Sequence, residues 1–166
     1  MGQRKKAVVI MAAGQGTRMR SSTSKLLHEV AGQPLIYYPV HMAQTLGAER
    51  IVLVLGHQRD AIKASVASRF PDAPLNYVIQ EEQLGTAHAV RCAEAALNGF
   101  EGDVIILSGD VPCLDAPVLS ELDRLKGDRP LGLVTMRVPA PNRYGRLVRS
   151  PDGTAQAIVE YGDCNE

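Results

Sequence analysis

The sequence VVIMAAGQGTRMRSSTSK, residues 8–25, decides the fold predicted for this chain. It begins with an apolar, β-branched run that has the length of a buried parallel strand. The run ends in AAGQG, residues 12–16, whose small residues let the backbone turn sharply and direct several N–H groups at an anion. Arg18 and Lys25 add two cations nearby. Because open α/β sheets bind ligands where such strands end, this stretch predicts a phosphate-binding site.

The glycine spacing excludes two common phosphate-binding motifs. The dinucleotide fingerprint needs a third glycine where this chain has Met19, and the glycine-lysine-serine/threonine string of a P-loop occurs nowhere. What remains is GQGTR at residues 14–18 with Lys25 close behind, which resembles the signature of the sugar-nucleotide nucleotidyltransferases. An ordinary glycine turn is the alternative, and the added threonine, arginine and lysine favour the phosphate site.

The composition is typical of one soluble globular domain. A chain of 166 residues can bury a core, and its 45% hydrophobic and 22% charged residues are ordinary for such a domain. Eighteen acidic residues balance eighteen basic ones, which argues against a nucleic-acid or anionic-membrane partner. The longest apolar run, residues 7–13, is too short to cross a bilayer. Cys92, Cys113 and Cys164 fit neither a disulfide framework nor a zinc site, so we expect a cytoplasmic protein.

Strands and helices are predicted to alternate along the chain. A helix is expected to begin at Pro34, with Pro39 kinking it or delaying its start. We expect an α/β, Rossmann-like, mostly parallel sheet with helices on both faces, and one domain over residues 1–166. The other predicted elements are strands at 51–55, 76–80, 104–107 and 131–138, helices at 60–70, from 85 onward and at 116–126, and a hairpin of 144–149 and 155–161.

A second candidate site residue, Asp110, follows the predicted strand 104–107 in the string Ser108-Gly109-Asp110. In a parallel sheet, a carboxylate at the end of this strand lies near the predicted phosphate loop. Mg²⁺ prefers oxygen ligands and usually takes one or two protein carboxylates together with substrate phosphates. Asp110 could instead only open a turn, but the neighbouring phosphate site favours a magnesium ligand.

A third candidate site reads QEEQLGTAH, from Gln80 to His88. The amides of Gln80 and Gln83 both donate and accept, as the polar edge of a nucleobase requires. Gly85 permits the close approach of a flat ring, and Thr86 can cap the next helix or bond to a ligand. A polar loop before a helix is the alternative interpretation. The histidine has no partner at metal-ligand spacing, and we assign it no role.

Taken together, the motifs are similar to those of the uridyltransferase domain of the bacterial bifunctional enzymes that make UDP-N-acetylglucosamine. The resemblance covers nearly the whole chain, and QLGTAHA is its most discriminating part. The matching pieces, in order, are AAGQGTRM, Lys25, LLHEVAGQPL, QEEQLGTAHAV, SGDVP, Tyr144-Gly145-Arg146 and Ile158-Val159-Glu160.

The resemblance implies transfer of UMP from UTP to N-acetylglucosamine 1-phosphate, giving pyrophosphate and UDP-N-acetylglucosamine for peptidoglycan synthesis, with Mg²⁺ as cofactor. It makes Arg18 and Lys25 the catalytic residues. By resemblance, the uridine would be held by Ala12, Ala13, Gly14, Gln80, Gln83, Gly85 and Thr86, the triphosphate would face Gly16, Thr17, Arg18 and Lys25, Mg²⁺ would bind Asp110, and the sugar would contact Gly145 and Glu160.

The implied reaction needs no general base. The attacking group is a phosphate monoester, which is largely ionised at neutral pH because its second pKa is about 6. This agrees with a sequence that contains no Ser-His-Asp or Cys-His set. The remaining work is positioning and charge neutralisation by Mg²⁺, Arg18 and Lys25.

The chain departs from the family pattern in three places. Ser24 stands where the family usually has proline, and Ser108 where an aromatic residue often forms a wall of the sugar pocket. The family domain continues beyond Glu166 with an asparagine that shares the metal and then a β-helix acetyltransferase domain. We therefore expect a chain truncated at its C-terminal end, with any homo-oligomer formed through the absent C-terminal domain.

Two other functions stay open from the sequence. One is transfer of another nucleotide, to a different sugar phosphate or to a molybdopterin or isoprenoid precursor. Such relatives share the glycine loop but are not expected to keep QLGTAHA. The other is a nucleotide-binding module without turnover, which the missing second metal ligand favours.

Overall fold

A computed structural model describes the chain in two compact units, one ending at Gly127 and one beginning at Asp128. In the described part of the chain, no helix combines the length and the apolar character that a membrane span requires. The described residues are 4–14, 16, 19, 21, 23–56 and 58–163.

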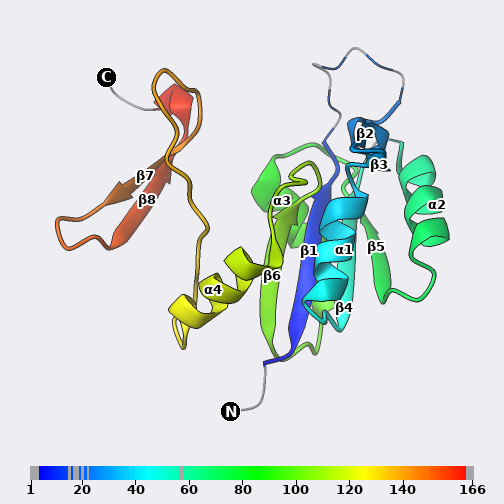
Figure 1. The fold of residues 1–166 in the computed structure, drawn as a ribbon, viewed down its shortest axis with the longest axis horizontal. Coiled ribbons are helices and arrows are strands. Elements are labelled where there is room, and N and C mark those ends of the chain that lie inside the picture. Colours follow the sequence, from blue (N-terminus) through cyan, green and yellow to red (C-terminus); the bar gives the residue numbers. More distant parts are fainter. Residues whose placement is uncertain are drawn as a thin grey trace. The chain divides into compact units, whose positions relative to one another are not determined.

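A parallel four-stranded sheet forms the centre of the first unit (Figure 1). Strand β1 (Lys6–Ala12) pairs with β4 (Arg50–Leu55) on one side and with β6 (Asp103–Ser108) on the other, and β5 (Leu75–Ile79) pairs with β4. Strands β1 and β4 are buried almost throughout, which is why they are continuous apolar runs in the sequence. The predicted strands at these four positions are confirmed.

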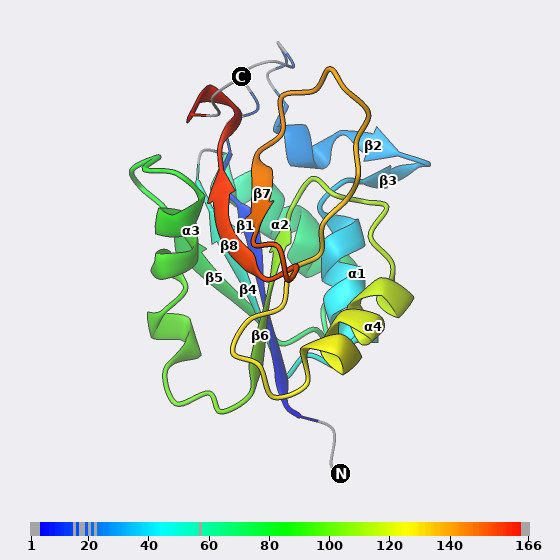
Figure 2. The same cartoon turned by 90° about the vertical axis from the view of Figure 1, so that its left-hand side faces the viewer.

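Helices cover both faces of this sheet (Figure 2). Val40, Val66 and Leu119 from three helices pack into one hydrophobic cluster, whereas Ala89 and Ala93 pack into a second cluster on the opposite face. The predicted α/β, Rossmann-like architecture is therefore confirmed. The helices of the first cluster are α1 (Tyr37–Thr45), α2 (Arg59–Arg69) and α4 (Ala116–Lys126), and that of the second is α3 (Thr86–Cys92), followed by the 3-10 helix η3 (Ala95–Leu97).

The predicted start of the first helix at Pro34 is wrong. Pro34 belongs to β3 (Gln33–Pro34), which forms a small antiparallel hairpin with β2 (Glu29–Val30) after the 3-10 helix η2 (Lys25–Leu27). Helix α1 begins later, so that Pro39 lies in its first turn, where a missing backbone N–H costs no intrahelical hydrogen bond. The delayed start that Pro39 suggested is the correct alternative.

The second unit contains an antiparallel hairpin of β7 (Arg146–Arg149) and β8 (Ala155–Val159), as predicted, followed by the 3-10 helix η4 (Tyr161–Asp163). The strand predicted at 131–138 is wrong, because these residues pair with none of the strands that the structure describes. Most of their apolar side chains, such as that of Met136, are exposed. An apolar pattern makes a strand only where a hydrogen-bonding neighbour is available.

Candidate active site

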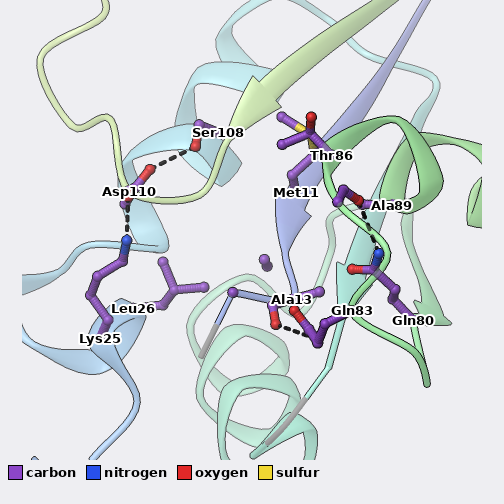
Figure 3. A pocket seen from close by; sticks show the side chains of 13 residues that line it. Met11, Ala13, Lys25, Leu26, Gln80, Gln83, Thr86, Ala89, Ser108 and Asp110 are labelled. Carbon is purple, nitrogen blue, oxygen red and sulfur yellow. Dashed lines mark hydrogen bonds and ion pairs between the residues drawn. The ribbon is translucent and has the colours of Figure 1, made fainter. Parts of the chain in front are cut away.

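The predicted site segments of the first unit meet at the carboxyl edge of the parallel sheet. The register places Ala12 beside Leu55 and Met11 beside Ser108, so the loops after β1, β4 and β6 leave the sheet together. A pocket of about 250 Å³ opens at this edge (Figure 3). The predicted site residues that line it are Ala12, Ala13, Gly14, Lys25, Gln80, Gln83, Gly85, Thr86 and Asp110.

Gln83 joins two of these loops. Its amide Nε2 donates a hydrogen bond of 2.9 Å to the carbonyl oxygen of Ala13. Gly56, which follows β4, makes this contact possible, because a Cβ atom there would lie 2.7 Å from the Ala13 oxygen and 2.9 Å from the Gln83 nitrogen. Sequence reasoning missed Gly56. A glycine directly after a buried strand was the available signal, but its neighbours come from distant segments.

Gln80 is buried, and its neighbours determine which end of its amide faces the pocket. Nε2 donates to the carbonyl oxygen of Gly85 at 3.1 Å and lies 3.0 Å from Nδ1 of His88. Because a carbonyl oxygen can only accept, the amide nitrogen must lie on this side, and the amide oxygen is the acceptor that Gln80 can offer to a ligand. His88, to which the sequence assigned no role, lies beside Gln80, and its Nδ1 is also 3.1 Å from the carbonyl oxygen of Glu82.

The turn that leads into α3 places Gly85 and Thr86 at the pocket. Gly85 is the N-cap of the helix and has a φ of 93°, a conformation that favours glycine. No side chain caps this helix, so the capping role considered for Thr86 is wrong. Thr86 is instead the first helical residue and lines the pocket.

On the opposite wall, Lys25 and Ser108 hold the carboxylate of Asp110 (Figure 3). Lys25 Nζ forms an ion pair with Asp110 Oδ2, and Ser108 Oγ donates to Asp110 Oδ1 at 2.6 Å. Partial burial raises the pKa of Asp110, but the hydrogen bonds from Lys25 and Ser108 and the positive charge of Lys25 outweigh it and hold the pKa below its ordinary value of 3.8. Asp110 is therefore ionised at neutral pH, as a metal ligand must be.

Two glycines permit this arrangement. Gly109 donates its backbone N–H to the carbonyl oxygen of Met11 at 2.9 Å, and a Cβ atom on Gly109 would lie 2.9 Å from that oxygen. Gly16 has a φ of 62°, and a Cβ there would lie 2.8 Å from Cβ of Lys25. Gly16 thus packs against the side chain of Lys25. Two other predicted triphosphate residues, Thr17 and Arg18, lie outside the described residues.

The pocket suits a divalent cation that is shared with a ligand. It offers oxygen donors from the carboxylate of Asp110 and the hydroxyl of Ser108. Among the described residues, no group of three or more His, Cys, Asp or Glu side chains could hold a metal ion. Mg²⁺ commonly binds one or two carboxylates and completes its coordination with water and phosphate oxygens. The donor set therefore fits Mg²⁺ bound with phosphates rather than an ion enclosed by protein.

The two predicted sugar-binding residues lie in the second unit. Gly145 precedes β7 and Glu160 follows β8, so both are at the open end of the hairpin. A Cβ atom on Gly145 would lie 3.6 Å from Oε2 of Glu160. The hairpin therefore brings these two residues together, although they are distant in sequence.

Known sequences resemble this chain over most of its length. The model of the MobA-like NTP transferase domain family matches residues 8–134. Bifunctional protein GlmU of Anaeromyxobacter sp. (strain K) is 49% identical over 162 residues, covering 96% of this chain and 33% of the relative. Bifunctional protein GlmU of Corynebacterium glutamicum (strain R) is 45% identical over 163 residues, covering 96% and 34%. The chain thus spans about a third of the length of these curated relatives.

Solved structures resemble the whole fold. The crystal structure of HddC from Yersinia pseudotuberculosis superposes with a TM-score of 0.71 and 25% identity, over 93% of this chain and 68% of that one. The same protein complexed with GMP-PN gives 0.70 and 26% over the same shares. UDP-glucose pyrophosphorylase complexed with UDP-glucose gives 0.60 and 24%, over 75% and 54%, which is a likeness of fold alone.

Proposed function

This chain belongs to the MobA-like NTP transferase domain family, and we propose that it transfers UMP from UTP to N-acetylglucosamine 1-phosphate, releasing pyrophosphate. The predicted resemblance to the bifunctional uridyltransferases is confirmed by the GlmU relatives, and the chain is a nucleotidyltransferase by family. The observation that supports the proposal is that one pocket is lined both by the amides of Gln80 and Gln83 and by the Lys25–Asp110 pair.

The amide orientation in the pocket favours uracil over cytosine. Uracil presents one N–H donor between two carbonyl acceptors. The oxygen of Gln80 is placed to accept such an N–H, because its nitrogen already contacts Gly85 and His88. Cytosine carries an unprotonated ring nitrogen at that position and would meet the same oxygen as a second acceptor. We propose that Ala12, Ala13, Gly14, Gln83 and Thr86 complete the uridine site.

The proposed reaction depends mainly on neutralising the negative charge of the phosphates. The phosphate of the sugar substrate is already ionised near neutral pH, so the chain needs to supply no base. Lys25 would stabilise the negative charge that develops on the leaving pyrophosphate, and Arg18, Gly16 and Thr17 would face the same phosphates. Mg²⁺ held by Asp110 would neutralise phosphate charge as a Lewis acid.

We propose that Gly145 and Glu160 contact the sugar phosphate. Glu160 carries a carboxylate, which can accept hydrogen bonds from sugar hydroxyls, and Gly145 beside it leaves room for a ring to approach. We also propose that residues 1–166 belong to one nucleotidyltransferase domain that works in the cytoplasm on a peptidoglycan precursor. Any homo-oligomer would form through a further domain, because this chain matches only 33% of the length of its GlmU relative.

The test is pyrophosphate release from the purified chain, with each pairing of UTP, CTP, GTP or ATP with N-acetylglucosamine 1-phosphate or glucose 1-phosphate. We expect release to need Mg²⁺ and to be fastest with UTP and N-acetylglucosamine 1-phosphate. Lys25→Ala should lower turnover about 10²- to 10³-fold, because it removes a charge that stabilises the transition state. Asp110→Asn should weaken the dependence of turnover on Mg²⁺ concentration.

Two outcomes would favour the alternatives. A preference for another nucleotide or sugar phosphate would assign the chain to a different transferase of the same family. Tight UTP binding in calorimetry without pyrophosphate release under any pairing would instead indicate a binding module that has no turnover.

A further inference from the structure

We infer that Lys25 is an internal counterion that occupies Asp110 until a nucleoside triphosphate arrives, so that metal binding and nucleotide binding are coupled. This inference rests on the proposed function, because it takes Asp110 as the metal ligand and Lys25 as a triphosphate contact. It adds that the ammonium group of Lys25 pairs first with Asp110 and then with the triphosphate, and cannot pair with both at once.

The carboxylate of Asp110 is occupied by protein groups. Both oxygens of Asp110 have a partner, Lys25 at Oδ2 and Ser108 at Oδ1. A divalent cation that bound Oδ2 would have to share this oxygen with an ammonium group of the same sign of charge. Metal binding to the nucleotide-free protein therefore requires the Lys25 ammonium to leave, and the free energy lost with the ion pair weakens the metal affinity.

Few charged side chains line the described part of the pocket. Among the described residues that line it, Asp110 is the one carboxylate and Lys25 the one cation. Their side chains are 35% and 27% exposed, so both can reach an entering ligand. A triphosphate carries more negative charge than a carboxylate and attracts the ammonium away from Asp110. The carboxylate is then free for the metal ion that accompanies the phosphates.

Both side chains are anchored near the backbone. Gly16 packs against Cβ of Lys25, which holds the base of that side chain in place. Ser108 holds Oδ1 of Asp110 at 2.6 Å, which keeps the carboxylate plane oriented when Lys25 leaves. An aromatic residue at position 108 would have no hydroxyl at this place. The exchange is therefore confined to the ammonium end of Lys25.

Coupling of this kind is reciprocal. A triphosphate must raise the metal affinity by the same factor as the metal raises the triphosphate affinity, and such factors are commonly about 5- to 150-fold. Removing the ammonium should impair the binding of UTP, yet it should improve the binding of a metal ion to the nucleotide-free protein.

The experiment is a titration of the nucleotide-free chain with Mn²⁺, followed by electron paramagnetic resonance of the free ion. Lys25→Met removes the ammonium and keeps an unbranched apolar side chain, so we expect Mn²⁺ to bind about 5- to 150-fold more tightly than to the parent. Lys25→Arg keeps the charge and should bind Mn²⁺ no more tightly than the parent. Ser108→Ala in the Lys25→Met background should lose part of the gain.

A matched control separates this effect from the loss of any positive charge. Lys5 forms an exposed ion pair with Glu49 at 3.2 Å, near the amino end of β1 and away from the pocket. Lys5→Met therefore removes the same charge and also releases a carboxylate, and it should leave the Mn²⁺ affinity unchanged. Circular dichroism of each variant checks that its secondary structure matches that of the parent.

The outcomes distinguish the inference from the function on which it rests. Equal Mn²⁺ affinity for the parent and Lys25→Met, with binding abolished by Asp110→Asn, would overturn the counterion exchange and leave the metal assignment intact. Binding that ignores Asp110→Asn would overturn both, and a Lys25→Met variant that binds no Mn²⁺ would overturn the counterion exchange. A gain in Lys25→Met that Asp110→Asn cancels in the double variant is the expected result.

Discussion

The two units of this chain hold their candidate site residues in different ways. In the first unit, strands β1 and β4 are buried almost throughout, and the pocket lies at the end of this packed sheet. In the second unit, none of the residues described in 128–163 is buried, and Gly145 and Glu160 are held by a two-stranded hairpin. A hairpin alone is marginally stable, whereas a packed sheet is not. The comparison teaches that the residues proposed to face the nucleotide are fixed by a core, and those proposed to face the sugar by local contacts.

The largest expected effect is on stability, and two isoleucines test it as a matched pair. Ile51 on β4 is 0% exposed and Ile158 on β8 is 62% exposed. Ile51→Ala should lower the free energy of unfolding by about 2 to 5 kcal/mol, because it leaves a cavity in the sheet core. Ile158→Ala should change it by less than about 0.5 kcal/mol. Urea denaturation measures both, and similar losses would contradict the difference between the units.

The next effect concerns the hydrogen bond between Gln83 and Ala13, against which Gly56 packs. Gly56→Ala would push its Cβ into the carbonyl oxygen of Ala13 and the amide of Gln83, so we expect the affinity for UTP to fall roughly tenfold. Gly162→Ala in the second unit is the matched control, because its Cβ would meet open space. Calorimetry with UTP compares the two, and unchanged binding in Gly56→Ala would argue against a role for this contact.

A smaller effect should separate the sugar side from the nucleotide side. Glu160→Gln removes the charge but keeps the shape, and we expect the KM for N-acetylglucosamine 1-phosphate to rise about threefold to fivefold. The dissociation constant for UTP should stay the same. Glu101→Gln, at another exposed glutamate, serves as the control in the first unit. A loss of UTP affinity in Glu160→Gln would mean that this residue also acts on the nucleotide side.

The smallest effect is a shift in the titration of one carboxyl group. The pKa of Asp110 is lowered by Lys25 and Ser108 against the effect of burial, whereas that of Asp152 in the hairpin turn is lowered by a hydrogen bond from Ser150. Lys25→Met should therefore raise the pKa of Asp110 and leave that of Asp152 unchanged. Carbon-13 NMR of the carboxyl groups measures both values.

The sign of the accompanying pH effect follows from linkage. Because the pKa of Asp110 is lower in the folded chain than the ordinary 3.8, its ionised form stabilises the fold at every pH above that ordinary value. This contribution is lost as the pH falls through the lower, folded pKa. Stability that instead declined as the pH rose through this range would contradict the assignment.

Most of the sheet could be predicted because its strands are continuous apolar runs. The parallel strands β1, β4 and β6 each leave this signal, and their order in an α/β sheet brings their ends to one edge. The segment 131–138 carries a similar signal and forms no strand, because a pattern of apolar residues does not specify a pairing partner. Pro34 likewise suits a helix start or a short strand, and the hairpin contact with β2 decides between them.

The candidate site was predictable as a set of segments but not as a set of contacts. Lys25, Asp110 and the two glutamines could be named from their types and places in the chain. The hydrogen bond from Ser108 and the orientation of Gln80 by the carbonyl oxygen of Gly85 could not, since each depends on which atoms meet in the fold. The family resemblance marked Ser108 only as a departure that removes an aromatic wall, and gave no sign of its hydrogen bond to Asp110.

The Lys25–Asp110 pair joins positions that are 85 residues apart along the chain, and the rest of the pocket comes from two further segments. None of these walls exists until the parallel strands have assembled, so the unfolded chain offers nothing for a nucleotide to bind. A ligand that binds only the folded chain at 100 times its dissociation constant adds about 2.7 kcal/mol to the free energy of unfolding. Substrate binding in this pocket thus also stabilises the folded sheet. A rise in melting temperature would report that binding before any bond is broken.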